Sequence, residues 1–157
     1  MERNCAAALA REIAEPVVAP RTGAALDKPI HVLLVEDHRE AAEQTQIRLA
    51  QEGEYRFRVE WTSSLLEAMQ RLGKPGIDVV LLDLGMPELS GYKTFRAIEA
   101  ATEDKLPIVV FTSDESPVSR DLTLGCGAAG YLLKRKSSPA QLRQALGSAV
   151  IGKCGHR

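Results

Sequence analysis

Short apolar runs alternate with segments of helical spacing along this chain, and this alternation restricts the possible folds more than any other property of the sequence. Five runs from residue 30 onward have the length and character of β-strands: Ile30–Val35, Tyr55–Trp61, Ile77–Leu82, Ile108–Phe111 and Tyr131–Leu133. Helical spacing is expected in 38–51, 65–72, 90–101, 116–125 and after the Ser138-Pro139 helix start. Strands that alternate with helices predict a parallel sheet covered by helices on both faces.

The character of each run predicts its place in this sheet. The first and third runs are almost continuously apolar, which is typical of central strands with both faces buried. The second run places Phe57, Val59 and Trp61 on one side and Arg58 and Glu60 on the other, which is typical of an edge strand. We therefore predict an α/β fold, a doubly wound five-stranded parallel sheet in the order 2-1-3-4-5.

The length of 157 residues suits one domain with appended segments. We interpret residues 1–28, which are rich in alanine, proline and charge, as a flexible N-terminal extension. Residues 29–152 are the predicted folded domain, and 153–157 are a short C-terminal tail. Hydrophobic residues at 45% and charged residues at 26% are ordinary for a soluble globular protein.

Charge and cysteine content argue against several classes of partner and location. A net charge of -1 gives no field that favours nucleic acid or a membrane surface. Cys5, Cys126 and Cys154 are widely spaced, and we expect free thiols in a reducing compartment. The apolar stretch 5–10 is too short for a signal peptide or a membrane span. These observations predict a cytoplasmic protein.

Polar residues capable of chemistry follow the predicted strands. Glu36 and Asp37 end the first strand, Asp83 the third, Thr112 the fourth and Lys134 the fifth. Ligands of such sheets bind at the carboxyl ends of the strands where the strand order reverses. Three carboxylates there repel one another unless a cation joins them, and Mg²⁺ suits such oxygen ligands. A carboxylate nucleophile, a metal, an ammonium group and a hydroxyl are what phosphoryl transfer requires.

Four motifs carry a resemblance to a known family. They are the acidic pair in VLLVEDH, the central VVLLDLGMPELSG, the FTS after the fourth strand and the YLLK of the fifth. The chain resembles a response regulator receiver domain of two-component signalling, of the CheY-like superfamily, over roughly residues 30–151. The resemblance implies the flavodoxin-like receiver fold, and we interpret the chain as a stand-alone, single-domain form.

The resemblance also implies a role for each residue of the site. Asp83 would be the phosphoacceptor, and Lys134 would pair with Asp83 and the phosphoryl group. Asp37 would bind Mg²⁺ directly, with Glu36 assisting, and the backbone carbonyl of Gly85 would be a further metal ligand.

Two further residues match the switch of the family. The resemblance implies that Thr112 donates its hydroxyl to a phosphoryl oxygen and that Tyr131 turns inward when the threonine moves. Pro87 and Gly91 match the turn that shapes the loop after the acceptor. Thr112 also fits a helix start, Tyr131 fits simple packing, and we interpret His38 as a surface residue.

The function implied is a phosphoacceptor in a phosphorelay, phosphorylated by a histidine kinase or a histidine phosphotransfer protein. We expect no enzyme activity beyond self-catalysed phosphoryl transfer and autodephosphorylation. Output would be contact with a downstream protein target through the fourth helix, fifth strand and fifth helix, a mildly basic face with Arg135, Lys136 and Arg143. This face also leaves room for a homodimer, and we expect no direct contact with nucleic acid or membrane.

The sequence leaves several alternatives open. The chain could be a degenerate receiver that acts as a phosphorylation-independent interaction module, or a receiver module that serves a kinase in a larger system. A phosphohydrolase is disfavoured because Gly85 stands where such enzymes carry a second acid. Arg135 replaces the usual proline after the lysine, so the bond before it is either trans with a reshaped loop or cis and strained. Gly85 and Asp114 flank the site, and we expect Gly85 to leave the phosphoryl group open to water.

Overall fold

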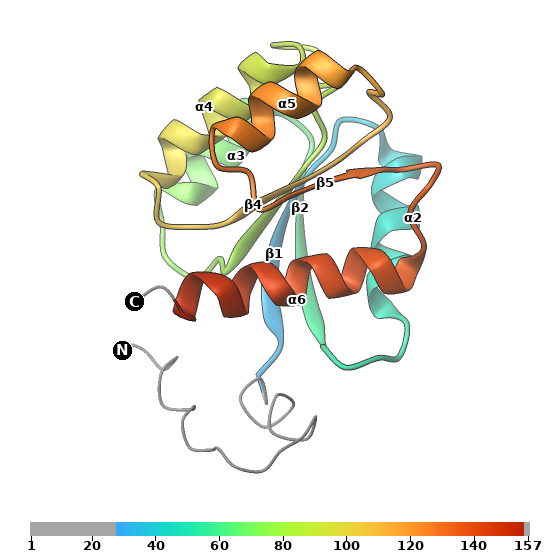
Figure 1. Cartoon of the computed structure of the whole chain (residues 1–157). Helices are drawn as coiled ribbons and strands as arrows, with labels where there is room; N and C mark the ends of the chain where they lie inside the picture. Colours follow the sequence, from blue (N-terminus) through green and yellow to red (C-terminus); the bar gives the residue numbers. More distant parts are fainter. Residues whose placement is uncertain (1–27, 156–157) are drawn as a thin grey trace.

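The computed structural model describes residues 28–155, and their strands form one parallel sheet in the order β2-β1-β3-β4-β5 (Figure 1). The predicted fold class and strand order are confirmed. The strands are β1 (Ile30–Val35), β2 (Phe57–Thr62), β3 (Val79–Leu82), β4 (Ile108–Thr112) and β5 (Gly130–Leu133). The helices are α2 (Arg39–Ala50), α3 (Leu65–Leu72), α4 (Tyr92–Thr102), α5 (Pro117–Gly125) and α6 (Pro139–Gly155).

Burial along the strands explains the order of the sheet. Every residue of β3 and β4 is buried, and five of the six residues of β1 are buried. The alternating strand β2 has only half-buried and exposed residues, and it pairs with β1 alone. Continuously apolar strands need cover on both faces, so they occupy the centre of the sheet. The prediction of β2 as an edge strand is confirmed.

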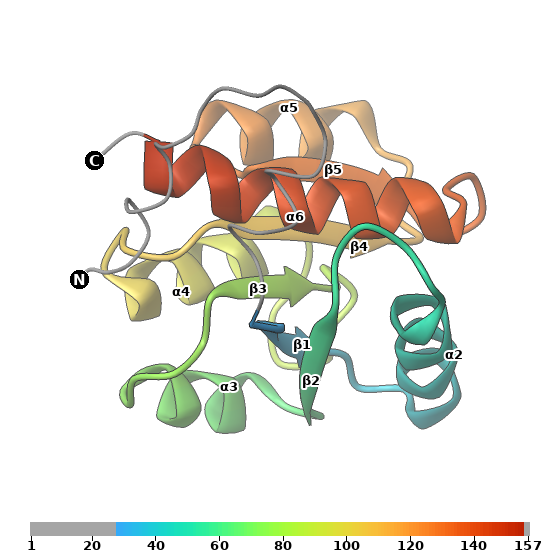
Figure 2. The same ribbon diagram turned by 90° about the horizontal axis from the view of Figure 1, so that it is seen from below.

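Two apolar clusters attach the helices to opposite faces of the sheet. Buried residues of α3 and α4, among them Phe95 and Ile98, pack on one face, where α5 also lies. Residues of α2 and α6, among them Leu49, Leu142 and Leu146, pack on the other face (Figure 2). Helix α2 buries Ala42, Thr45 and Leu49, a weakly apolar face.

Serine side chains mark the beginnings of three helices. The Ser138 hydroxyl accepts from the backbone N–H of Gln141 at 3.1 Å, and the Gln141 side chain accepts from the Ser138 N–H at 2.8 Å. This reciprocal pair is a capping box, and it fixes where α6 begins. Ser116 before Pro117 and Ser64 cap α5 and α3 through single hydrogen bonds. The turn that leads from β5 into α6 is therefore anchored at its far end.

One glycine of α6 is required by a close approach. A Cβ atom at Gly147 would lie 2.3 Å from the ring of Tyr55, a distance that real Cβ atoms do not show. The Tyr55 ring thus packs on the bare backbone of α6.

The described residues include the predicted folded domain but only small parts of the predicted N-terminal extension and C-terminal tail. The N-terminal extension lies outside the described residues except for Lys28, and α6 continues to Gly155, three residues into the predicted tail. These boundaries stay predictions. Among residues 28–155, none of the helices combines the length and the apolar character needed to span a bilayer.

Candidate functional site

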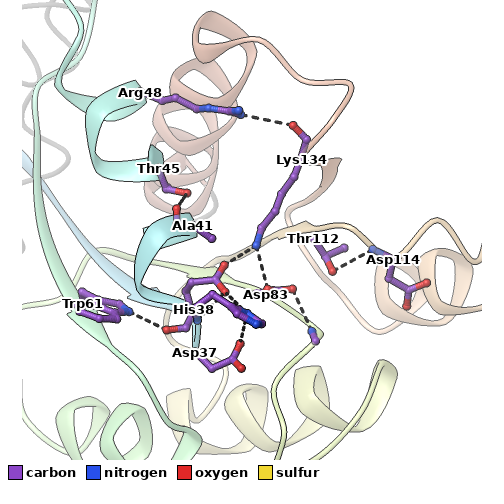
Figure 3. Close-up of polar contacts among 12 residues, drawn as sticks. Asp37, His38, Ala41, Thr45, Arg48, Trp61, Asp83, Thr112, Asp114 and Lys134 are labelled. Carbon is purple, nitrogen blue, oxygen red and sulfur yellow. Dashed lines mark hydrogen bonds and ion pairs between the residues drawn. The ribbon is translucent and has the colours of Figure 1, made fainter. Parts of the chain in front are cut away.

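The carboxyl ends of four strands bring the predicted site residues to one edge of the sheet. Glu36 and Asp37 follow β1, Asp83 follows β3, Thr112 ends β4 and Lys134 follows β5. Strands β1 and β3 are neighbours in the sheet but not in the sequence, and the strand order reverses between them. The close-up view shows the Lys134 side chain pointing toward Asp83 (Figure 3).

Lys134 is the centre of this arrangement. Its Nζ lies 2.9 Å from Asp83 Oδ2 and also contacts Glu36 Oε1. Both carboxylates are buried, and the Glu36 side chain is almost completely so. A single ammonium group therefore bridges two carboxylates that come from different strands. Charge-assisted contacts of this kind are stronger than hydrogen bonds between neutral groups.

The pKa values of the two carboxyl groups shift in opposite directions. Burial raises the pKa of Glu36, and the charge of Asp83 adds to the increase, while Lys134 only partly opposes it. Burial also acts to raise the pKa of Asp83, but the Gly85 N–H and Lys134 outweigh it, so this pKa is lowered. Burial acts to lower the pKa of Lys134, but both carboxylates outweigh it, and this pKa is raised. Asp83 is thus the carboxylate that is held ionised.

Gly85 places no side chain beside Asp83 in the loop after β3. The Gly85 N–H donates to Asp83 Oδ1 at 2.9 Å. A Cβ atom at position 85 would lie 3.5 Å from this oxygen and 3.9 Å from Oδ2, at ordinary contact distance. A side chain there would pack against the carboxylate, and glycine adds no such contact.

The acidic pair fits a divalent cation. The buried Asp37 Oδ1 has no hydrogen-bond partner among the described residues, although His38 Nδ1 lies 3.2 Å from it. One ligand atom from each of Glu36, Asp37 and His38 lies within 4.8 Å of the other two. The Lys134 ammonium contacts Glu36 and Asp83, and no contact with Asp37 is described. A buried Asp37 oxygen without a hydrogen bond, close to the Glu36 carboxylate, is the oxygen-rich setting that Mg²⁺ prefers.

Thr112 and Tyr131 meet on the loop after β4. The buried Thr112 hydroxyl accepts from the Asp114 N–H at 3.2 Å, and it helps to lower the pKa of Asp83. Tyr131 is half-buried, and its hydroxyl donates to the Asp114 carbonyl oxygen at 2.9 Å. The Asp114 carboxylate accepts from the Ser116 N–H at 2.8 Å. The two predicted switch residues therefore hold the same residue of the loop.

The turn after Lys134 resolves one open alternative. There are no cis peptide bonds within residues 28–155, so the bond between Lys134 and Arg135 is trans. Residues 134–136 form a turn, with the Lys136 N–H donating to the Leu133 carbonyl oxygen at 3.1 Å. With Arg135 in place of the usual proline, the peptide bond after Lys134 is trans. The Lys134 ammonium nevertheless contacts Asp83.

Arg143, which we expected on the mildly basic face, is half-buried and also binds another helix. Its guanidinium donates to the carbonyl oxygens of Arg48 at 3.3 Å and Glu52 at 3.1 Å, both at the end of α2. The carbonyl groups of the last helical turn have no partner within their own helix, and a cation stabilises them. Arg135 and Lys136 are exposed as expected.

Sequence reasoning missed two side chains that contact the site. Trp61 Nε1 donates to the Glu36 carbonyl oxygen at 2.7 Å, and Arg48 Nη1 donates to the Lys134 carbonyl oxygen at 3.5 Å (Figure 3). The register of Trp61 opposite Leu34, two residues before Glu36, is the one signal for the first contact. The sequence contains no comparable signal for Arg48.

Comparison with known families agrees with this geometry. The family described as the response regulator receiver domain matches residues 32–147. The response regulator MprA of Mycobacterium sp. (strain KMS) is 34% identical over 106 residues, which cover 68% of this chain and 44% of MprA. The transcriptional regulatory protein CreB of Escherichia coli (strain K12) is 35% identical over 103 residues, or 66% of this chain and 43% of CreB.

A third relative is of another type. The autoinducer 2 sensor kinase/phosphatase LuxQ of Vibrio parahaemolyticus is 33% identical over 108 residues, which are 69% of this chain but 12% of LuxQ. The chain therefore spans less than half the length of each of these three relatives.

Solved structures share the fold. A receiver domain protein from Clostridium thermocellum superposes with a TM-score of 0.70 at 25% identity, over 82% of this chain and 99% of that one. A CheY-like receiver from Methanospirillum hungatei JF-1 has a TM-score of 0.70 at 18% identity, over 83% and 100% of the two chains, and shows the fold alone. With the family match, the strand order and the acidic edge together, this chain belongs to the response regulator receiver domain family of two-component systems.

Proposed function

We propose that this receiver is the phosphoacceptor of a phosphorelay and takes a phosphoryl group on Asp83 in an Mg²⁺-dependent reaction. The observation that carries the proposal is the Asp83 carboxylate itself. One oxygen accepts from the Gly85 N–H, the other contacts Lys134, and its pKa is lowered. An ionised carboxylate at an accessible sheet edge is the form that can attack phosphorus.

The residues around Asp83 supply what such a transfer needs. An Asp83 oxygen forms a bond to phosphorus while the bond from phosphorus to the donor breaks, and the donor leaves with the electron pair. Lys134 lies against Asp83 Oδ2 and can neutralise charge on the transferred oxygens. The Thr112 hydroxyl, whose oxygen accepts from the Asp114 N–H, would donate its hydrogen to a phosphoryl oxygen. Water attack on phosphorus later releases phosphate and restores the carboxylate.

A magnesium ion would be held by Asp37, Glu36, Asp83 and the Gly85 carbonyl. When bound, Mg²⁺ neutralises charge on the phosphoryl oxygens and orients them. The Asp37 Oδ1 atom supports this assignment, because it is the buried side-chain oxygen that lacks a hydrogen-bond partner among the described residues. Glu36 feels the charge of Asp83, and a dication between the two carboxylates would offset their repulsion.

The proposed partners follow from membership of the family. The phosphoryl donor would be a phosphohistidine of a kinase or of a phosphotransfer protein. Output would be contact of a target, or of a second copy, with the face formed by α5, β5 and α6. On α5 this face exposes Val118 at 66% and Leu122 at 45%, apolar side chains that a partner could cover. We propose no enzyme activity beyond the self-catalysed transfer and the loss of phosphate.

The direct test uses acetyl phosphate as donor and the intact mass of the protein as readout. A gain of one phosphoryl group that requires Mg²⁺ and is lost in Asp83→Asn is the expected result. Asp121→Asn, which changes an exposed carboxylate on α5, is the matched control and should behave as the wild type. If the wild type gains no mass with acetyl phosphate or with a phosphohistidine donor, the degenerate interaction module becomes the better interpretation.

Metal binding can be tested separately through the single tryptophan of the chain. Trp61 donates to the Glu36 carbonyl oxygen, so its fluorescence should respond when a cation joins the acidic pair. A saturable response to Mg²⁺ that is lost in Asp37→Asn is expected. A response of the same size in that variant would contradict the proposed ligand set.

A further inference from the structure

The backbone that carries Lys134 is held from two sides. On one side, the Lys134 N–H donates to the Thr112 carbonyl oxygen at 2.9 Å, which continues the pairing of β4 with β5. On the other side, the Lys134 carbonyl oxygen accepts from Arg48 Nη1 on α2 at 3.5 Å (Figure 3). Arg48 lies 86 positions away in the sequence and crosses from another element to reach this turn.

The guanidinium of Arg48 is itself fixed in place. It lies 5.7 Å above the ring centroid of Phe111, a buried residue of β4, in a cation–π arrangement. The end of α2 is held by Arg143, which donates to the Arg48 and Glu52 carbonyl oxygens. A Cβ atom at Gly53 would lie 2.9 Å from the Arg143 guanidinium, so the bare glycine makes room for it.

These interactions differ from those of an ordinary surface arginine. The two partners described for the Arg48 guanidinium are a backbone carbonyl and an aromatic ring, and neither is a carboxylate. Both partners belong to the strand ends that form the site. The side chain therefore joins the end of α2 to the turn that aims Lys134 at Asp83.

We propose that Arg48 is a positioning residue: it holds the turn after β5 so that the Lys134 ammonium stays against Asp83. This inference rests on the proposed phosphoacceptor function. Arg48 contacts the backbone of Lys134, and its described partners include none of the acidic residues. Its replacement should therefore change the rate of phosphoryl transfer while the affinity of the acidic pair for Mg²⁺ stays the same.

The interactions of the guanidinium set the size of the expected effect. Its removal eliminates one long hydrogen bond, and the turn is then held by the bond between the Lys134 N–H and the Thr112 carbonyl oxygen. One hydrogen bond contributes roughly 1 kcal/mol, which corresponds to about a fivefold slower transfer. Removal of Lys134 itself should have a larger effect, because the charge is then absent rather than misplaced.

The experiment measures the initial rate of Asp83 phosphorylation by acetyl phosphate with saturating Mg²⁺ for Arg48→Met and Arg48→Lys. We expect about a fivefold reduction for Arg48→Met and a smaller one for Arg48→Lys, which keeps a charged donor on a similar stem. Arg39→Met is the matched control, because this arginine of the same helix pairs with Glu43 at 3.1 Å, away from the turn. Urea unfolding shows whether each variant is folded, and Arg48→Lys takes the place of Arg48→Met should the latter not fold.

Two further measurements separate positioning from a general structural role. Trp61 fluorescence should give the same Mg²⁺ affinity for Arg48→Met as for the wild type. In a Lys134→Met background, Arg48→Met should cause no further slowing, because the group that it positions is gone. An equal slowing in that background, or wild-type rates for both Arg48 variants, would overturn the inference. A wild type that takes no phosphoryl group would overturn the proposed function, and this inference with it.

Discussion

Replacing Lys134 by methionine tests how the site balances its charges. Methionine keeps most of the length of the lysine stem but removes the ammonium group that contacts Glu36 and Asp83. The side chains of the two carboxylates are 1% and 10% exposed, so they would face each other with little water between them. We expect the variant to be less stable than the wild type near neutral pH when no divalent cation is added.

The structure sets the scale of this loss. Removing one partner of a buried ion pair typically costs about 3–5 kcal/mol in the free energy of unfolding. The Lys134 side chain is 19% exposed, and Glu36 can take up a proton, so water and protonation offset part of the cost. We therefore expect a loss of roughly 2 kcal/mol near neutral pH, and a smaller loss when Mg²⁺ binds the remaining carboxylates.

The loss should depend on pH in a defined direction. Lys134 acts to lower the pKa of both Glu36 and Asp83, so its removal raises both. A carboxyl group whose pKa is raised by folding contributes stability below its unfolded value, and this contribution is lost as pH rises through the folded value. The unfolded values are 4.5 for Glu36 and 3.8 for Asp83. The difference between variant and wild type should thus be small below roughly pH 4 and grow toward neutral pH.

Urea unfolding followed by circular dichroism at an acidic and a neutral pH measures this difference. Lys136→Met is the control, because Lys136 is exposed and lies 3.8 Å from Glu115, an ion pair worth little at the surface. A loss of the same size at both pH values would refute the reasoning, since it would show that packing of the lysine stem matters more than its charge. No loss at neutral pH would refute it as well.

Three further predictions concern the surroundings of the site. Gly85→Asn should slow the loss of phosphate from Asp83 about three- to tenfold, because its side chain would cover the carboxylate; an unchanged dephosphorylation rate would contradict this. Burial and the charge of Asp114 raise the pKa of Tyr131 to about 12. The phenolate absorbance of Tyr131, measured as the difference from Tyr131→Phe, should therefore appear well above pH 10. The contribution of this raised pKa to stability should be lost over the same rise in pH. Arg135→Pro should leave phosphorylation by acetyl phosphate intact, since the bonds that hold this turn come from Lys134 and Lys136; a loss would show that the turn depends on its present shape.

The fold could be predicted because burial on both faces leaves a strong pattern in the sequence. The predicted strand Ile30–Val35 has the observed bounds. The predicted strand Tyr55–Trp61 differs: β2 begins at Phe57 and ends at Thr62, which pairs with Val35 of β1. Pairing register decides where a strand ends, and register depends on a neighbouring strand that the local pattern does not describe.

The meeting of the site residues at one edge could be predicted for a related reason. Parallel strands present their carboxyl ends at one edge, so charged residues after buried runs meet there whatever connects the strands. The interactions among them could not be predicted in the same way. The sequence predicts only a metal-binding role for Glu36, whereas its side chain also contacts Lys134. It predicts a place for Arg143 on a mildly basic face, and this side chain also binds the end of α2. Both interactions depend on how two elements pack.

The side chains that escaped prediction share a type of partner. Trp61, Arg48 and Arg143 all donate to backbone carbonyl oxygens. Every residue has a carbonyl group, so the acceptor leaves no mark in the sequence, and only the packed structure identifies it. Trp61 and Arg48 bind the backbone of Glu36 and Lys134, and their described contacts do not include the charged groups of these residues. We therefore expect their removal to change the rate of phosphoryl transfer more than it changes the affinity for metal or the stability of the fold. Measurements of this rate are the way to find further residues of this kind.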